Sequence, residues 1–184
     1  QKIRLKLRKT PMSPRTQNWL SSAVLYQVYL QSFCDSNADG IGDIPGLITK
    51  LDYLASLGVN GIWLSPCFKS PFNDAGYDVA DYRKVARRYG TNADLRNLFK
   101  QAHDRNIRVF LDLIPGHTSI EHPWFQASAR PQKNKYSNYY IWTDSIWHQP
   151  PAPLHGIRGY STRDGSYITN FFWFQPALNY GFAQ

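Results

Sequence analysis

Three short runs rich in apolar, β-branched and aromatic residues constrain the fold of this 184-residue chain more than any other feature. They span residues 23–30, 59–65 and 107–114, and each has the length and composition of a buried strand. Two stretches with helical spacing of apolar residues separate them. A strand–helix–strand–helix–strand order with short links predicts a parallel sheet with right-handed crossovers.

The two helical stretches carry recognisable ends. Gly58 stands where a glycine ends a helix, and Thr91 with Asp94 forms a start resembling a capping box, with Asp in place of Glu or Gln. The residues expected to face the core are Leu47, Ile48, Leu51, Leu54 and Ala55 in the first helix, and Leu95, Leu98, Phe99 and Ala102 in the second.

The charge of the chain is concentrated at its start. The formal net charge is +8, from 21 basic and 13 acidic residues, and six of the basic residues lie in the first fifteen positions. The remaining 15 basic and 13 acidic residues give the body only +2. We therefore expect a basic, flexible arm at residues 1–18 and no nucleic-acid partner. Salt-dependent DNA binding that disappears on deletion of residues 1–15 would indicate otherwise.

No run of 18 apolar residues exists, so no membrane span is expected. The basic start lacks an apolar stretch, so no intact signal peptide is expected, although a chain cleaved after one would look the same. Cys34 and Cys67 are too few for a disulfide scaffold and lack metal-ligand spacing. The cysteines therefore do not indicate whether the protein works in an oxidising or a reducing compartment.

Polar loops with aromatic residues follow all three predicted strands, at 35–43, 68–82 and 112–119. Ligands bind at the carboxyl ends of the strands in parallel α/β folds. Residues 118–184 then form a long excursion without sustained periodicity, with small strands possible near 167–174. Long loops of this kind are usually functional.

The first loop, DSNADGIGD, offers oxygen atoms at alternating positions. Alternating hard oxygens with Gly40 at the turn suit calcium, although the preceding strand and Gly46 disfavour an EF-hand. The alternative is a hydrated turn capped by Asp side chains. We favour calcium, with ligands Asp35, Asn37, Asp39, the Ile41 carbonyl and Asp43.

The second loop combines a carboxylate and an aromatic ring, Asp74 and Tyr77, a pair suited to sugar recognition by hydrogen bonding and stacking. The alternative, carboxylates that cap the next helix, fits Asp78 and Asp81 better. Asp112 and His117 end the third strand, and taken alone such a pair is more often structural.

Several motifs together resemble the α-amylase family of glycoside hydrolases, family 13, most closely its α-glucosidase and oligo-1,6-glucosidase branch. They run in the family's order from about Trp19 to Asn179. The motifs are AVLYQVYLQSF, DSNADGIGDIPG, LDYLASLGVNGIWLSP, FKSP, GYDVADY, DLIPGHTS followed by HPWF, NYYIW and QPALN.

The resemblance implies a (β/α)8 TIM barrel of which strands one to three are present, in residues 19–117, followed by an inserted small domain, residues 118–184, incomplete at its C-terminal end. It also implies an α-linked gluco-oligosaccharide substrate. Asp74 would hold the terminal glucose, Tyr77 would stack on it, His117 would bind the same sugar and Asp112 would support the site. The loop at 35–43 resembles the family's calcium loop.

Two positions depart from the family pattern. Gly116 replaces the usual Asn before the histidine, so a calcium site that uses this Asn is not expected. Ala177 replaces the acid of the QPDLN motif, which weakens the assignment to the oligo-1,6-glucosidase branch and the prediction of the substrate's linkage.

The catalytic carboxylates of the family are expected beyond this chain. The resemblance implies a retaining mechanism with an Asp after the fourth strand and a Glu after the fifth, and Glu121, the single glutamate, lies outside that motif. A barrel needs roughly 250 residues. We therefore expect no catalytic residue in this segment, no activity from it alone, and a need for the remainder of the barrel.

Two other functions remain open. The chain could belong to a non-catalytic barrel relative that acts as an assembly subunit, as in transporter heavy chains, although the retained Asp74–Tyr77 pair counts against this. It could also belong to a member of the family that transfers glucosyl groups or isomerises its substrate.

Overall fold

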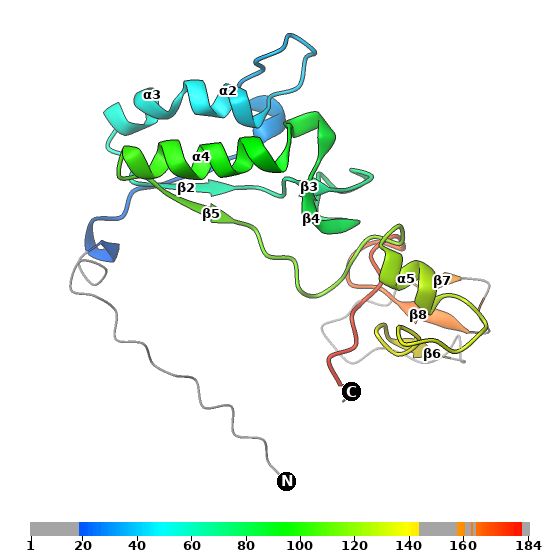
Figure 1. The fold of residues 1–184 in the computed structure, drawn as a ribbon. Helices are drawn as coiled ribbons and strands as arrows, with labels where there is room; N and C mark the ends of the chain where they lie inside the picture. Colours follow the sequence, from blue (N-terminus) through cyan, green and yellow to red (C-terminus); the bar gives the residue numbers. More distant parts are fainter. Residues whose placement is uncertain (1–18, 144–157, 161–162, 164, 182–184) are drawn as a thin grey trace.

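The computed structural model describes residues 19–143, 158–160, 163 and 165–181 (Figure 1). The predicted arm at 1–18 lies outside these residues. The described chain forms a larger unit in which helices cover a sheet, and a smaller unit that follows the last strand of that sheet (Figure 1). Within the described residues, no helix is long and apolar enough to cross a bilayer.

The larger unit is built on three parallel strands, β1 (Leu25–Val28), β2 (Gly61–Leu64) and β5 (Arg108–Leu111), in the order β1-β2-β5. Val28 pairs with Leu64, and Leu64 with Leu111, so the three strands end level with one another. The strands predicted at 23–30, 59–65 and 107–114 are confirmed, each shorter at both ends. Two 3-10 helices flank β1, namely η1 (Leu20–Ser22) and η2 (Leu30–Ser32).

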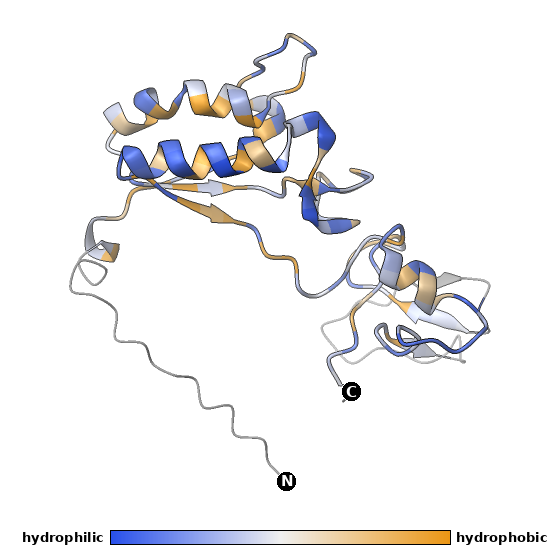
Figure 2. Cartoon of the chain, in the orientation of Figure 1, coloured by the Kyte–Doolittle hydropathy of each residue, from blue (hydrophilic) through white to orange (hydrophobic). Residues whose placement is uncertain are grey.

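The helices α2 (Ile44–Thr49), α3 (Leu51–Ser56) and α4 (Asn92–Asp104) lie on one side of this sheet (Figure 1). Apolar residues alternate with polar ones along these helices (Figure 2). Leu95, Leu98 and Ala102 of α4 are buried. The capping box of Thr91 and Asp94 is present, with Asp as its acidic partner.

The first predicted helix is divided in two. Lys50, with φ −101° and ψ 1°, leaves the helical conformation and separates α2 from α3. The predicted end is confirmed: Gly58 has φ +78°, its N–H donates to the Ala55 carbonyl over 3.0 Å, and the Val59 N–H donates to the Leu54 carbonyl over 3.2 Å. These two bonds form a Schellman motif, and the left-handed conformation explains the glycine.

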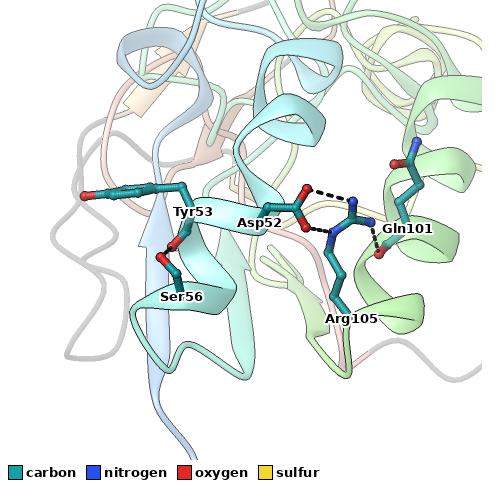
Figure 3. Close-up of polar contacts among 5 residues, drawn as sticks. All are labelled: Asp52, Tyr53, Ser56, Gln101 and Arg105. Atoms are coloured by element: carbon teal, nitrogen blue, oxygen red, sulfur yellow. Dashed lines mark hydrogen bonds and ion pairs between the residues drawn. The ribbon is translucent and has the colours of Figure 1, made fainter.

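An ion pair joins α3 to the end of α4 (Figure 3). The Arg105 guanidinium donates to both oxygens of Asp52, over 2.7 Å from Nε and 3.1 Å from Nη2, and Nη1 donates to the Gln101 carbonyl. The hydrogen bond from Arg105 holds the pKa of Asp52 below its ordinary value. Because Asp52 is exposed, the pair orients the two helices and adds little to stability.

A two-stranded antiparallel hairpin, β3 (Phe68–Lys69) and β4 (Asp81–Val85), follows β2, and η3 (Arg87–Tyr89) leads into α4. The main hydrophobic core consists of buried residues from the sequence range Val28–Ile107. A second cluster, centred on Phe125, Tyr140 and Tyr167, supports the smaller unit.

The smaller unit contains α5 (Pro123–Ser128) and the antiparallel strands β6 (Trp142–Thr143), β7 (Arg158–Tyr160) and β8 (Ser166–Ile168), in the order β6-β8-β7. All three residues of β8 are buried. One of the small strands possible near 167–174 is thus present as β8, which ends at Ile168. Beyond it, Thr169 forms an isolated bridge with Pro176.

Candidate functional site

A cavity of about 420 Å³ lies where the carboxyl end of the parallel sheet meets the smaller unit. The residues that line it are Asp74, Tyr77, His117, Asn170, Phe171 and Phe172. The three side chains expected to contact sugar thus come together from two loops. Cavities of about 440 Å³ and about 350 Å³ elsewhere contain none of the predicted site residues.

Asp78 shapes the loop that carries Asp74 and Tyr77. Its buried carboxylate accepts from the Ser70 hydroxyl over 2.7 Å, from the Asn73 N–H over 3.0 Å and from the Asp74 N–H over 3.3 Å. The expectation that Asp78 caps the following helix is therefore wrong, because its acceptors are used within its own loop. Asp81 caps no helix either: it lies in β4 and accepts from the Arg83 N–H.

Asp74 is held by the smaller unit. The side-chain amide of Gln175 donates to Asp74 Oδ2 over 2.7 Å, across 101 positions of sequence. Gln175 is fully buried, whereas Asp74 keeps partial exposure to solvent. One oxygen of this carboxylate is thus committed to the protein, and the other can serve a ligand hydroxyl.

Asp112 lies behind Tyr77 and receives two hydrogen bonds. Trp63 Nε1 donates to its Oδ1 over 2.7 Å, and the Tyr77 hydroxyl donates to its Oδ2 over 3.0 Å. Partial burial and this hydrogen bond raise the pKa of Tyr77. The phenol therefore stays protonated at neutral pH and acts as donor, which suits the supporting role proposed for Asp112.

His117 is almost fully buried, and both ring nitrogens have partners. Nε2 lies 3.1 Å from the Tyr77 carbonyl oxygen and Nδ1 lies 3.3 Å from Asn170 Nδ2. Because a carbonyl only accepts and an amide nitrogen only donates, the proton sits on Nε2. Burial lowers the pKa of His117, which favours this neutral form. A hydrogen bond from the ring to a sugar would have to replace one of these contacts.

Sequence reasoning missed Asn170, Phe171, Phe172 and Gln175. The signal for Gln175 was its place in the QPALN motif. No sequence signal pointed to Asn170; in the structure, a Cβ at position 116 would lie 2.8 Å from Asn170 Nδ2. The absent side chain at 116 thus makes room for the amide that contacts His117. The other departure, Ala177, pairs with His117 in an isolated antiparallel bridge.

The loop at 35–43 is closed by its own hydrogen bonds. Asp35 accepts from the N–H groups of Asn37, Ala38 and Gly40, and Asp43 accepts from the Gly46 N–H at the start of α2. Within the described residues, no three Asp, Glu, His or Cys side chains form a metal-binding group. Five oxygen donors in one loop suit calcium chemically. Calcium therefore stays a prediction.

Other reactive side chains lie away from the cavity. Cys34 and Cys67 are free thiols, and burial raises the pKa of Cys67 to about 11, so it is not a nucleophile at neutral pH. Glycoside hydrolysis needs two carboxylates, and Asp74 is the single one among the described residues that line the cavity. The described lining residues therefore supply at most one of these two carboxylates.

Comparison with known proteins places this arrangement in context. The family described as alpha amylase, catalytic domain, matches residues 27–182. An oligo-1,6-glucosidase of Parageobacillus thermoglucosidasius is 52% identical over 168 residues, covering 88% of this chain and 30% of the relative. A trehalose synthase/amylase of Mycolicibacterium smegmatis is 41% identical over 174 residues, covering 91% of this chain and 29% of the relative.

Comparison with solved structures leads to the same family. The crystal structure of an alpha-glucosyl transfer enzyme, XgtA, superposes with a TM-score of 0.83 at 43% identity, covering 89% of this chain and 32% of that one. This chain thus spans about 30% of the length of the curated relatives it matches. The extent of the family match, the identities and the parallel β1-β2-β5 sheet show that this chain belongs to the α-amylase family, in its α-glucosidase-like branch, and represents an N-terminal segment of that family's (β/α)8 barrel.

Proposed function

We propose that this chain is the N-terminal part of a retaining α-glucoside hydrolase that acts on the α-glucosidic bonds of oligosaccharides. The observation that carries the proposal is the meeting of Asp74, Tyr77 and His117, from two separate loops, around one cavity. In the same proposal, residues 19–117 contribute the first three β/α units of the barrel, and residues 118–184 contribute the inserted domain.

The proposed binding mode follows from the side chains of the cavity. The Tyr77 ring, about a third exposed, stacks on the apolar face of the terminal glucose. The Asp74 oxygen that does not contact Gln175 accepts from sugar hydroxyls, and His117 with Asn170 forms the polar wall beside it. Two catalytic carboxylates about 5–5.5 Å apart must come from later strands of the barrel. The 184-residue chain alone should therefore release no glucose.

Substitution of Asp74 tests the proposal in the enzyme that contains this chain. We expect Asp74→Asn to lower kcat/KM for isomaltose and maltose by at least about 100-fold, because a charged acceptor to the bound glucose is lost. Asp104→Asn, at the exposed end of α4, is the matched control and should leave kcat/KM unchanged. Activity of Asp74→Asn equal to the parent enzyme would overturn the proposal.

Glucosyl transfer is a second candidate, favoured by the names of two relatives, a trehalose synthase/amylase and an alpha-glucosyl transfer enzyme. Product analysis distinguishes the two. Incubation with maltose should yield mainly free glucose from a hydrolase, whereas a transferase or isomerase would convert maltose mainly into new disaccharides or longer sugars.

We also propose that the loop at 35–43 binds calcium through Asp35, Asn37, Asp39, the Ile41 carbonyl and Asp43. A bound ion stabilises the folded state by mass action, so millimolar calcium should raise the Tm by several degrees relative to EDTA. Asp39→Asn keeps an acceptor for the Ile41 N–H but removes a charge, and should abolish this difference. Equal Tm values in calcium and EDTA would contradict the proposal.

A further inference from the structure

Gln175 connects the two units of the chain at the candidate site. Building on the proposed function, we infer that Gln175 is a positioning residue that orients the Asp74 carboxylate toward bound sugar. Through this contact, the affinity of the barrel segment for glucose depends on a residue of the inserted segment.

The amide of Gln175 has only one orientation that satisfies both of its ends. Nε2 donates to Asp74 Oδ2 over 2.7 Å, and Oε1 lies 3.2 Å from the Phe172 N–H, which donates to it. A carboxylate only accepts and a backbone N–H only donates, so a flipped amide would lose both bonds. The geometry therefore defines Gln175 as the donor and Asp74 as the acceptor.

The backbone around Gln175 is equally constrained. Its N–H donates to the Phe172 carbonyl over 2.8 Å, and its carbonyl accepts from the Asn170 N–H over 3.2 Å. A bridge between Thr169 and Pro176 closes this turn. Because the side chain is fully buried, an amide without Asp74 would be left unsatisfied, so the contact is costly to break.

One turn thus has two functions at the cavity. It contributes Asn170, Phe171 and Phe172 to the wall, and it holds Asp74 from the opposite loop. The hydrogen bond restricts rotation of the carboxylate and engages Oδ2, which leaves Oδ1 as the oxygen for sugar hydroxyls. A carboxylate oriented before binding loses less entropy when the sugar arrives.

Two substitutions in the enzyme that contains this chain test the inference, with the inhibition constant of glucose as the readout. Gln175→Leu removes the donor, and we expect about tenfold weaker glucose binding at every pH. Gln175→Glu places a carboxyl group against Asp74. At low pH the two groups share a proton and binding is nearly normal, whereas at higher pH they repel and binding weakens.

The pH dependence separates positioning from a structural role, because loss of packing alone would not follow the ionisation of a carboxyl pair. His117, Tyr77 and Asp78 are the other titratable side chains near Asp74, and they are identical in the parent enzyme and in the variant. The difference between Gln175→Glu and the parent enzyme therefore isolates the new carboxyl group. Gln126→Glu, an exposed position of the same inserted segment, is the matched control and should follow the parent profile.

The outcomes distinguish this inference from the proposed function. Loss of activity in Asp74→Asn, with parental glucose binding at all pH values in both Gln175 variants, would overturn the inference and leave the proposed function standing. Parental behaviour of Asp74→Asn would overturn both. If Gln175→Leu fails to fold, Gln175→Glu still decides: a profile parallel to that of the parent enzyme contradicts the inference, and binding that weakens as pH rises supports it.

Discussion

The carboxylate of Asp112, just after β5, connects two other side chains near the candidate site. Trp63 on β2 and Tyr77 in the following loop both donate to it. Asp112 is absent from the cavity lining, so its effect on a ligand passes through the tyrosine. The Tyr77 side chain therefore combines a ring that lines the cavity with a hydroxyl that fixes the position of the ring.

These two properties of Tyr77 can be separated by substitution. In the proposed parent enzyme, Tyr77→Phe keeps the ring and removes the bond to Asp112, so we expect KM for isomaltose to rise by less than about tenfold. Tyr77→Ala also removes the stacking surface and should raise KM further. Steady-state kinetics measure both, and Tyr53→Phe, exposed on α3, is the control. Equal KM values for Tyr77→Phe and Tyr77→Ala would contradict a stacking role.

At the scale of elements, the start of α5 depends on an unusual cap. His122 Nδ1 accepts from the Trp124 N–H over 3.1 Å, with Pro123 at the first helical position. Only the neutral ring can accept at Nδ1, and burial lowers the pKa of His122. Protonation would therefore remove the cap at the same time as it placed a charge in a buried position.

This cap predicts a pH dependence of stability with a definite sign. Below the unfolded value of about 6.5, the unfolded chain binds protons that the folded His122 and His117 resist, so the free energy of unfolding falls as pH falls. Protonation of His122 should lower the free energy of unfolding by about 1 kcal/mol, the typical contribution of an N-cap. Urea unfolding at pH 7.5 and 5.0 measures it.

His122→Asn is the informative variant, because Asn is a good N-cap and does not titrate. It should reduce the pH dependence while preserving stability at pH 7.5. His103→Asn, at an exposed position of α4, should leave the dependence as it is. An unchanged slope in His122→Asn would show that the cap is not the titrating contact.

The molecule as a whole exposes apolar parts of its parallel sheet. Leu25 in β1 and Phe110 in β5 are 55% and 39% exposed, and Leu113, just after β5, is 78% exposed. Within the described residues, β1 and β5 each pair on one side only. In a complete barrel, further strands and helices would cover these surfaces.

We therefore expect the isolated 184-residue chain to self-associate and to bind a hydrophobic dye. Sedimentation velocity and dye fluorescence measure these properties. Leu113→Ser, in the exposed segment after β5, should reduce both, whereas Tyr53→Ser on the helical face should change neither. A monomeric chain without dye binding would contradict this expectation.

Local patterns in the sequence were sufficient for the three parallel strands and for the helix ends, and the predicted residues account for three of the six that line the cavity. Apolar runs predicted the three parallel strands, and the residues at 58, 91 and 94 predicted helix ends, because capping and burial depend on neighbours within a few positions. The family motifs identified Asp74, Tyr77 and His117 as candidate site residues, and all three line one cavity in the structure. Their roles stay predictions.

The tertiary structure alone decided how the loops hold one another. Nothing local in the sequence shows that Gln175 reaches Asp74 across 101 positions, or that Asn170 fills the space beside Gly116. The sequence pattern also could not show that the Asp78 carboxylate accepts hydrogen bonds from within its own loop. Sequence periodicity reports which face of an element is buried, whereas these hydrogen bonds depend on where two separately folded loops meet. That meeting is set by the packing of the whole chain.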